Sequence, residues 1–157
     1  DVNQVLSDTP LLFSKEHGAK QLPFSLDSYL LIIDTGVVGI TKHTLEHVKD
    51  NLKTYKPYID ELGNITKKVI KPLKEKNIDL IGEYMYKAHS LLKKIGVSHE
   101  KNDEVVELCK NNNAKGAKLT GGGAGGCCIC LCDTKENALK IQDELKEKGY
   151  LSWMVTV

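Results

Sequence analysis

The sequence lacks a strong charge of either sign and any long hydrophobic run. Its 22 basic and 21 acidic residues leave a formal net charge of +1, so electrostatics give no reason to expect nucleic acid or an acidic membrane surface as a partner. No apolar run approaches the roughly 20 residues of a membrane-spanning helix. The chain does not open with a basic segment followed by an apolar one, as a secretory signal would require. We therefore expect a cytoplasmic protein with neither a membrane nor a nucleic acid as its partner.

Disulfide and metal-site patterns are also scarce, although five cysteines are present. Cys128, Cys130 and Cys132 alternate along an expected strand and therefore share one face. Such neighbours lie about 6.6 Å apart with parallel Cα–Cβ bonds, which is poor geometry for a disulfide. Buried thiols in a reducing compartment are the expected outcome, and no metal site is predicted.

No linker, internal repeat or low-complexity tract divides the 157 residues, so we predict a single domain over residues 1–157. Apolar and β-branched runs predict strands over residues 11–15, 20–24 and 29–33. A series of helical patterns follows, and the chain then ends in strand, loop, strand, helix and strand. This order predicts an α+β fold, with helices covering one face of an antiparallel sheet.

Glycine is concentrated between two of the later strands, over residues 121–126. Glycine costs backbone entropy, so a cluster in an ordered setting indicates positive φ angles or a close approach by another group. Free amides in such a turn can bind phosphate. A dinucleotide-binding loop needs a helix after the glycines and a Walker loop needs Gly-Lys-Ser/Thr, whereas an apolar strand at 127–132 follows here. We predict a strand–glycine loop–strand element, the alternative being a flexible connector.

A second glycine-containing loop, residues 34–39, follows the buried strand before it. Thr41 is placed to cap the helix that begins after this loop. A loop at the end of a buried strand is a common position for ligand contacts. In the same helix His43, Glu46 and His47 match H-x-x-E-H, the inverted zinc-protease motif, but the charged residues around them favour a solvated helix face.

Residues 118–127, K-L-T-G-G-G-A-G-G-C, resemble the third signature motif of the GHMP kinases, the family named for galacto-, homoserine, mevalonate and phosphomevalonate kinases. The mevalonate kinases match best, with K-[LM]-[ST]-G-x-G-x-G-G-C between two strands. Residues 32–41 are similar to their I-D-T-G-V-x-G-x-T loop, and residues 96–99 to the segment after their long helices. The resemblance implies the C-terminal half of a mevalonate kinase, with the ferredoxin-like antiparallel sheet of the GHMP-kinase C-terminal domain.

The resemblance also implies roles for individual residues. Asp1 matches, by its spacing, the catalytic aspartate that accepts or orients the proton of the substrate hydroxyl. Thr41 and Gly122 would lie beside mevalonate, and Lys118 is expected to be structural. The members of the glycine loop are Thr120, Gly121, Gly122, Gly123, Gly125 and Gly126. They would form the floor of the site and support the phosphate loop of the other half of the enzyme.

The family's second motif, P-x-x-x-G-L-G-S-S, does not occur in these 157 residues. In the family it supplies most of the ATP phosphate loop, and a lysine and a magnesium-binding glutamate also belong to the N-terminal half. The resemblance therefore implies ATP and Mg2+ held mainly by an N-terminal kinase half, mevalonate as substrate, and no activity of this chain alone. The chain begins with Asp1 rather than Met, which we interpret as processing or as a piece of a longer protein.

Two other functions remain open from the sequence. One is another GHMP kinase, such as a phosphomevalonate kinase. The other is a non-catalytic α+β module that binds a ligand. The sequence also leaves the oligomeric state open, a homodimer included.

Overall fold

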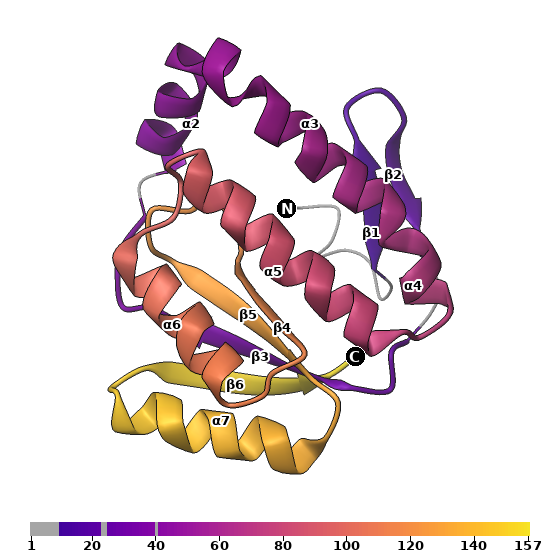
Figure 1. Ribbon diagram of the computed structural model, residues 1–157, viewed down its shortest axis with the longest axis vertical. Coiled ribbons are helices and arrows are strands. Elements are labelled where there is room, and N and C mark those ends of the chain that lie inside the picture. Colours follow the sequence, from indigo (N-terminus) through magenta and orange to yellow (C-terminus); the bar gives the residue numbers. More distant parts are fainter. Residues whose placement is uncertain (1–9, 23–24, 40) are drawn as a thin grey trace.

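A four-stranded antiparallel sheet is the centre of the fold (Figure 1). The computed structural model describes residues 10–22, 25–39 and 41–157. The strands, in spatial order, are β4 (Gly116–Leu119), β5 (Cys127–Cys132), β3 (Tyr29–Asp34) and β6 (Leu151–Thr156). A separate hairpin pairs β1 (Leu11–Ser14) with β2 (Gly18–Gln21). The predicted α+β class with an antiparallel sheet is confirmed.

The central strands β3 and β5 carry the apolar runs that the sequence marks as buried. Leu31 lies opposite Cys130 and Ile33 opposite Cys128, and all four side chains are fully buried. Because strand residues alternate between faces, these side chains share the face that packs against helices. Cys132 is also buried on β5, and all five cysteines are free thiols. The predicted common face of the alternating cysteines is confirmed.

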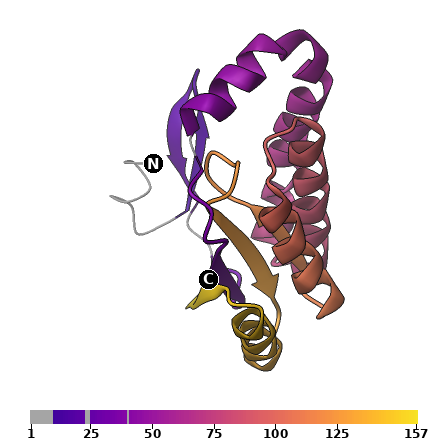
Figure 2. The ribbon, with the colours of Figure 1, turned by 90° about the vertical axis from the view of Figure 1, so that its left-hand side faces the viewer.

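Helices cover this face and one edge of the sheet. They are α5 (Ile78–Lys94), α6 (Glu100–Asn111) and α7 (Lys135–Glu147). Val105 and Cys109 of α6 and Ile141 and Leu145 of α7 are fully buried in the same core as the strands. Figure 2 shows α5 and α6 together on one side of the sheet. The predicted single helical layer is therefore observed.

The opposite face of the sheet carries no helix from the part of the chain that the structure describes. Leu151, Trp153 and Val155 of β6 lie on this face, because Met154 between them pairs with Leu31 and packs into the core. Their exposed fractions are 65%, 53% and 39%. We call the surface formed by these β6 side chains the open sheet face. Contiguous exposed apolar side chains commonly mark an interaction surface.

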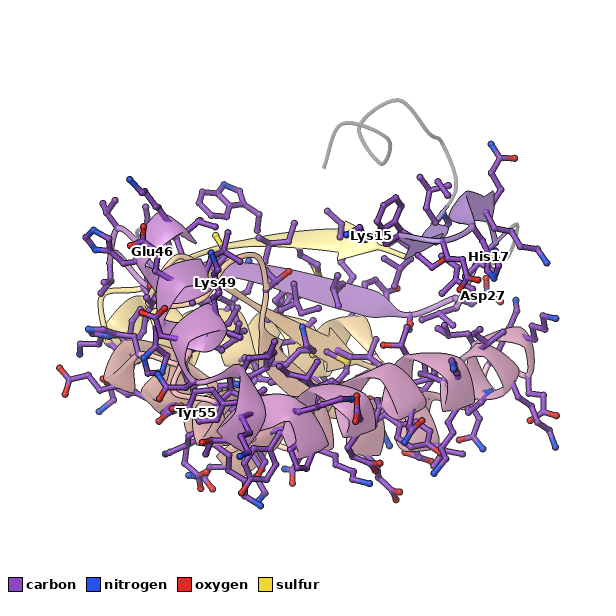
Figure 3. All side chains as sticks on the ribbon, turned by 90° about the horizontal axis from the view of Figure 1, so that it is seen from above. Lys15, His17, Asp27, Glu46, Lys49 and Tyr55 are labelled. Atoms are coloured by element: carbon purple, nitrogen blue, oxygen red, sulfur yellow. The ribbon has the colours of Figure 1, made fainter. Side chains whose placement is uncertain are left out.

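The segment between β3 and α5 forms an arm of helices. Its members are α2 (Thr41–Asp50), α3 (Leu52–Lys68) and α4 (Ile70–Lys74). Figure 3 shows Glu46 and Lys49 of α2 toward one end of the molecule, and His17, in the turn between β1 and β2, toward the other. No helix within the described ranges is both long and apolar enough to cross a membrane.

Candidate functional site

The glycine loop, residues 120–126, joins β4 to β5 and adopts a backbone conformation that explains its composition. The φ angle is positive at Gly121 (75°), Gly123 (78°), Ala124 (56°), Gly125 (113°) and Gly126 (64°). Side chains of L residues rarely adopt such angles, whereas glycine does so without a steric penalty. The structure therefore shows an ordered turn rather than a flexible connector.

Gly122 is required for a different reason, which is its contact with Thr41. A Cβ atom added at Gly122 would lie 2.7 Å from Thr41 Oγ1 and 2.9 Å from Thr41 Cγ2. Thr41 is an exposed side chain in the first residue of α2, and so it is part of the helix rather than the predicted cap before it. The two residues predicted to lie beside the substrate thus come from distant segments and meet at one place.

The rest of the loop packs against two neighbouring backbones. A Cβ atom at Gly123 would lie 2.2 Å from the Val97 carbonyl oxygen, and one at Gly125 would lie 2.7 Å from the Val37 carbonyl oxygen. In the other direction, a Cβ atom at Gly39 would lie 2.5 Å from the carbonyl oxygen of Gly123. The glycine loop is therefore held between the 34–39 loop and the turn that joins α5 to α6.

Asn102 of α6 binds both backbone polar groups of Gly125. Its Oδ1 accepts a hydrogen bond from the Gly125 N–H and its Nδ2 donates to the Gly125 carbonyl, both at 3.0 Å. The Nδ2 group also lies 3.4 Å from Cys128 Sγ, and Asn102 is fully buried. Because buried polar groups need partners, this amide both satisfies and positions the loop. Sequence reasoning missed Asn102.

Three of the other six amides of the loop donate to carbonyls within the protein. Those of Thr120, Ala124 and Gly126 donate to the carbonyls of Cys127, Val97 and Val37, at 2.9, 2.8 and 2.7 Å. Within the described residues, the amides of residues 121–123 have no such acceptor. These three amides are the ones with which the loop could bind an anion. The other four amides of the loop hold it against the rest of the protein.

Thr35 ties the 34–39 loop to the end of the glycine loop. Its N–H and its Oγ1 both donate to the carbonyl oxygen of Gly126, at 3.0 and 2.6 Å. The Gly36 N–H donates in turn to Asp34 Oδ1 at 2.9 Å. Thr35 is buried, so these two hydrogen bonds to one carbonyl oxygen are shielded from water. In the sequence, the only indication of a role for Thr35 was the resemblance of residues 32–41 to the I-D-T-G-V-x-G-x-T loop.

Lys118 brings a positive charge to the beginning of the glycine loop. Its Nζ donates to the Leu119 carbonyl at 2.5 Å, and the side chain is partly buried. Burial lowers the pKa of Lys118, and no carboxylate of the described ranges offsets this effect. A partly buried ammonium without a carboxylate partner is suited to an anionic ligand, which goes beyond the structural role predicted for it.

The sequence also pointed to Asp1 and to the zinc-protease motif of α2. Asp1 lies outside the described residues, so its catalytic role stays a prediction. His47 of the zinc-protease motif lies 3.1 Å from the Ile95 carbonyl oxygen and 3.2 Å from the Tyr55 hydroxyl. Among the residues that can be described, no group of three or more His, Cys, Asp or Glu side chains could hold a metal ion.

Comparison with known proteins places the site in context. Residues 69–151 match the family model described as GHMP kinases C terminal. A mevalonate kinase of Saccharolobus solfataricus is 33% identical over 91 residues, which are 58% of this chain and 29% of that protein. A mevalonate kinase of Pyrococcus abyssi is 32% identical over 134 residues, covering 80% of this chain and 40% of that protein.

Among solved structures, the mevalonate kinase of L. major in complex with R-mevalonate has a similar fold. The TM-score is 0.84 at 25% sequence identity, and the match covers 93% of this chain and 48% of that chain. The chain therefore spans less than half the length of each of these relatives.

Proposed function

Since this chain belongs to the family of GHMP-kinase C-terminal domains, we propose that it is the C-terminal half of a mevalonate kinase. Such an enzyme transfers the terminal phosphoryl group of ATP to the 5-hydroxyl of mevalonate. The observation that carries the proposal is the contact between Thr41 and Gly122, because the resemblance assigns both residues to the substrate. The mevalonate kinases among the relatives support the same activity.

In the proposed reaction, the oxygen of the 5-hydroxyl bonds to the γ-phosphorus of ATP while the bond from that phosphorus to ADP breaks. Asp1 accepts the hydroxyl proton. Phosphoryl transfer depends mostly on positioning and charge stabilisation. Thr41 and Gly122 provide positioning on the substrate side, and Lys118 provides positive charge beside the loop.

ATP and Mg2+ would be held mainly by a part of the kinase beyond these 157 residues. Among the described residues, the amides of residues 121–123 are available to bind an anion. The same residues contain no cluster of carboxylates that could hold Mg2+. We therefore propose that this chain alone does not phosphorylate mevalonate. Its free cysteines are consistent with the proposed location in a reducing cytoplasm.

The N-terminal half of the kinase is the proposed partner of the open sheet face. The relatives are more than twice as long as the region they share with this chain. Helices already cover the other face of the sheet, whereas Leu151, Trp153 and Val155 remain exposed. Packing a second layer on this face would bury them, at a gain of roughly 25 cal/mol per Å² of apolar surface.

We expect the complete enzyme to phosphorylate mevalonate, and Gly122→Ala to raise KM for mevalonate about tenfold. The added Cβ would lie 2.7 Å from Thr41 Oγ1, so the two groups beside the substrate must separate; losing a contact of about 1.4 kcal/mol corresponds to a factor of ten. The measurement is ADP release with mevalonate, phosphomevalonate or galactose as acceptor. Gly63→Ala inside α3, where the backbone is helical and the added Cβ meets nothing within 4 Å, is the control for a change remote from the site. Turnover of phosphomevalonate but not mevalonate would replace the proposal by a phosphomevalonate kinase.

A charge on the open sheet face should destabilise the complete enzyme. We expect Leu151→Lys to lower the free energy of unfolding by about 2 kcal/mol, because a lysine must be buried where the N-terminal half packs. Leu139→Lys on α7 is the matched control, since Leu139 is 45% exposed on the helical side of the molecule. Thermal unfolding of both variants checks this. Equal and negligible effects would show that nothing covers the open sheet face.

A further inference from the structure

His89 connects α5 to the strand that enters the glycine loop. The side chain is 7% exposed. Its Nδ1 accepts a hydrogen bond from the Leu119 N–H at 3.3 Å, and its Nε2 lies 3.1 Å from Asp103 Oδ1. A neutral imidazole has one donor nitrogen and one acceptor nitrogen. These two contacts therefore require the proton on Nε2, from which it is donated to Asp103.

Asp103 holds the imidazole in this orientation. Ser98 Oγ donates to Asp103 Oδ1 at 2.7 Å, and Lys93 Nζ pairs with Asp103 Oδ2 at 2.7 Å. Burial would raise the pKa of Asp103, but the hydrogen bonds from Lys93 and Ser98 outweigh burial and leave this pKa below its ordinary value. Asp103 is thus a carboxylate at neutral pH and accepts the Nε2 proton of His89.

These hydrogen bonds reach both sides of the glycine loop. Leu119 directly precedes Thr120, the first residue of the loop, and is 2% exposed, so water cannot replace the histidine as the acceptor for its amide. On the other side, Ser98 directly follows Val97, whose carbonyl accepts the N–H of Ala124 at 2.8 Å. The pair formed by His89 and Asp103 therefore links the backbone segments that hold the two sides of the loop.

We propose that His89 is a positioning residue for the glycine loop, and that the loop keeps its substrate-binding geometry only while this imidazole is neutral. The proposal rests on the proposed kinase function. A second proton would go to Nδ1, where it would face the Leu119 N–H, so that two donors oppose each other. The hydrogen bond that holds the end of β4 would then be lost, next to the residues that approach Thr41.

Burial and neighbouring charges act on the ring in opposite directions. Burial lowers the pKa of His89, Asp103 raises it, and Lys118 and Lys93 lower it further; the result is a pKa below the ordinary value of 6.5. The pKa of His89 is lower in the folded state than in the unfolded state. The neutral ring therefore stabilises the fold fully above the unfolded pKa, and this contribution is lost as the pH falls through the lower pKa of the folded state.

The test is the pH profile of the complete kinase between about pH 5 and pH 8. For the wild type, we expect KM for mevalonate to rise as the pH falls below the ordinary histidine pKa of 6.5, while kcat changes less. His89→Asn places an amide oxygen near the position of Nδ1, so KM at neutral pH should stay within about threefold and the acid rise should disappear. His89→Leu leaves the Leu119 amide unpaired and should raise KM about tenfold at every pH. His43→Asn, an exposed histidine of α2, is the control that keeps the wild-type profile.

A second measurement does not depend on catalysis. Nitrogen-15 NMR of the histidine ring should place the proton of His89 on Nε2. The protection of the Leu119 amide, taken as its exchange rate relative to the intrinsic rate at the same pH, should be high at neutral pH and lower at acid pH. An acid rise in KM that persists in His89→Asn, or a proton on Nδ1, would overturn the positioning role. A kinase that does not use mevalonate would overturn the proposed function instead, and the exchange of the Leu119 amide would still decide the role of His89.

Discussion

Replacing Gly82 with alanine should lower the free energy of unfolding by about 3 kcal/mol. The added Cβ would lie 1.8 Å from the Lys115 carbonyl oxygen and 2.3 Å from the carbon of the same group. Gly116 of β4 also lies against Gly82, since a Cβ atom added at Gly116 would lie 2.4 Å from Gly82 Cα. Backbone atoms cannot rotate away as a side chain can, so α5 would have to move off β4. Denaturant unfolding measures the effect.

Gly63→Ala is the matched control for this change. Gly63 also lies inside a helix, α3, but an added Cβ there meets nothing within 4 Å. Alanine is a better helix former than glycine, so this variant should be about 0.5 to 1 kcal/mol more stable. The two substitutions therefore have opposite expected signs. A Gly82→Ala protein as stable as the wild type would mean that α5 and β4 are not in backbone contact.

Replacing Asn102 with leucine should cost about 3 kcal/mol or more and disorder the glycine loop. The amide group makes two 3.0 Å hydrogen bonds to Gly125, and its Oδ1 also accepts the His99 N–H at 3.1 Å. Leucine leaves these backbone groups buried without partners, and each such group costs about 1 to 3 kcal/mol. We expect a lower denaturation midpoint together with faster amide exchange at Gly125.

Two further variants separate the hydrogen bonds from the helix itself. Asn111→Leu makes the same substitution at an exposed position of α6, so it should change stability by less than about 0.5 kcal/mol. Asn102→Asp keeps the shape but replaces the donor that faces the Gly125 carbonyl by a carboxylate oxygen. Its destabilisation should decrease as the pH falls and the carboxyl group gains a proton. A loss of stability that does not depend on pH would argue against the donor role of Nδ2.

Local patterns in the sequence determined the elements and the conformation of the glycine loop. The apolar run of β3 predicted a buried strand, because a strand that is covered on both faces needs apolar side chains on both of them. The alternating cysteines of β5 predicted one shared buried face, which the structure confirms. The glycines of residues 121–126 predicted positive φ angles or a close approach by another group. The structure shows positive φ at Gly121, Gly123, Gly125 and Gly126 and a close approach at Gly122. The motif in the same stretch also predicted the family that the comparison confirmed.

Only the tertiary structure decided which groups meet. Thr41 and Gly122 were predicted as substrate residues one at a time, and their contact depends on how α2 lies against the glycine loop. Asn102 and His89 look in the sequence like ordinary helix residues, since an asparagine in the first turn of a helix usually lies at the surface. Their partners, Gly125 and Leu119, are distant in the chain. A hydrogen bond between distant residues leaves no periodic signal, because the packing of α5 and α6 against the sheet places the two groups together.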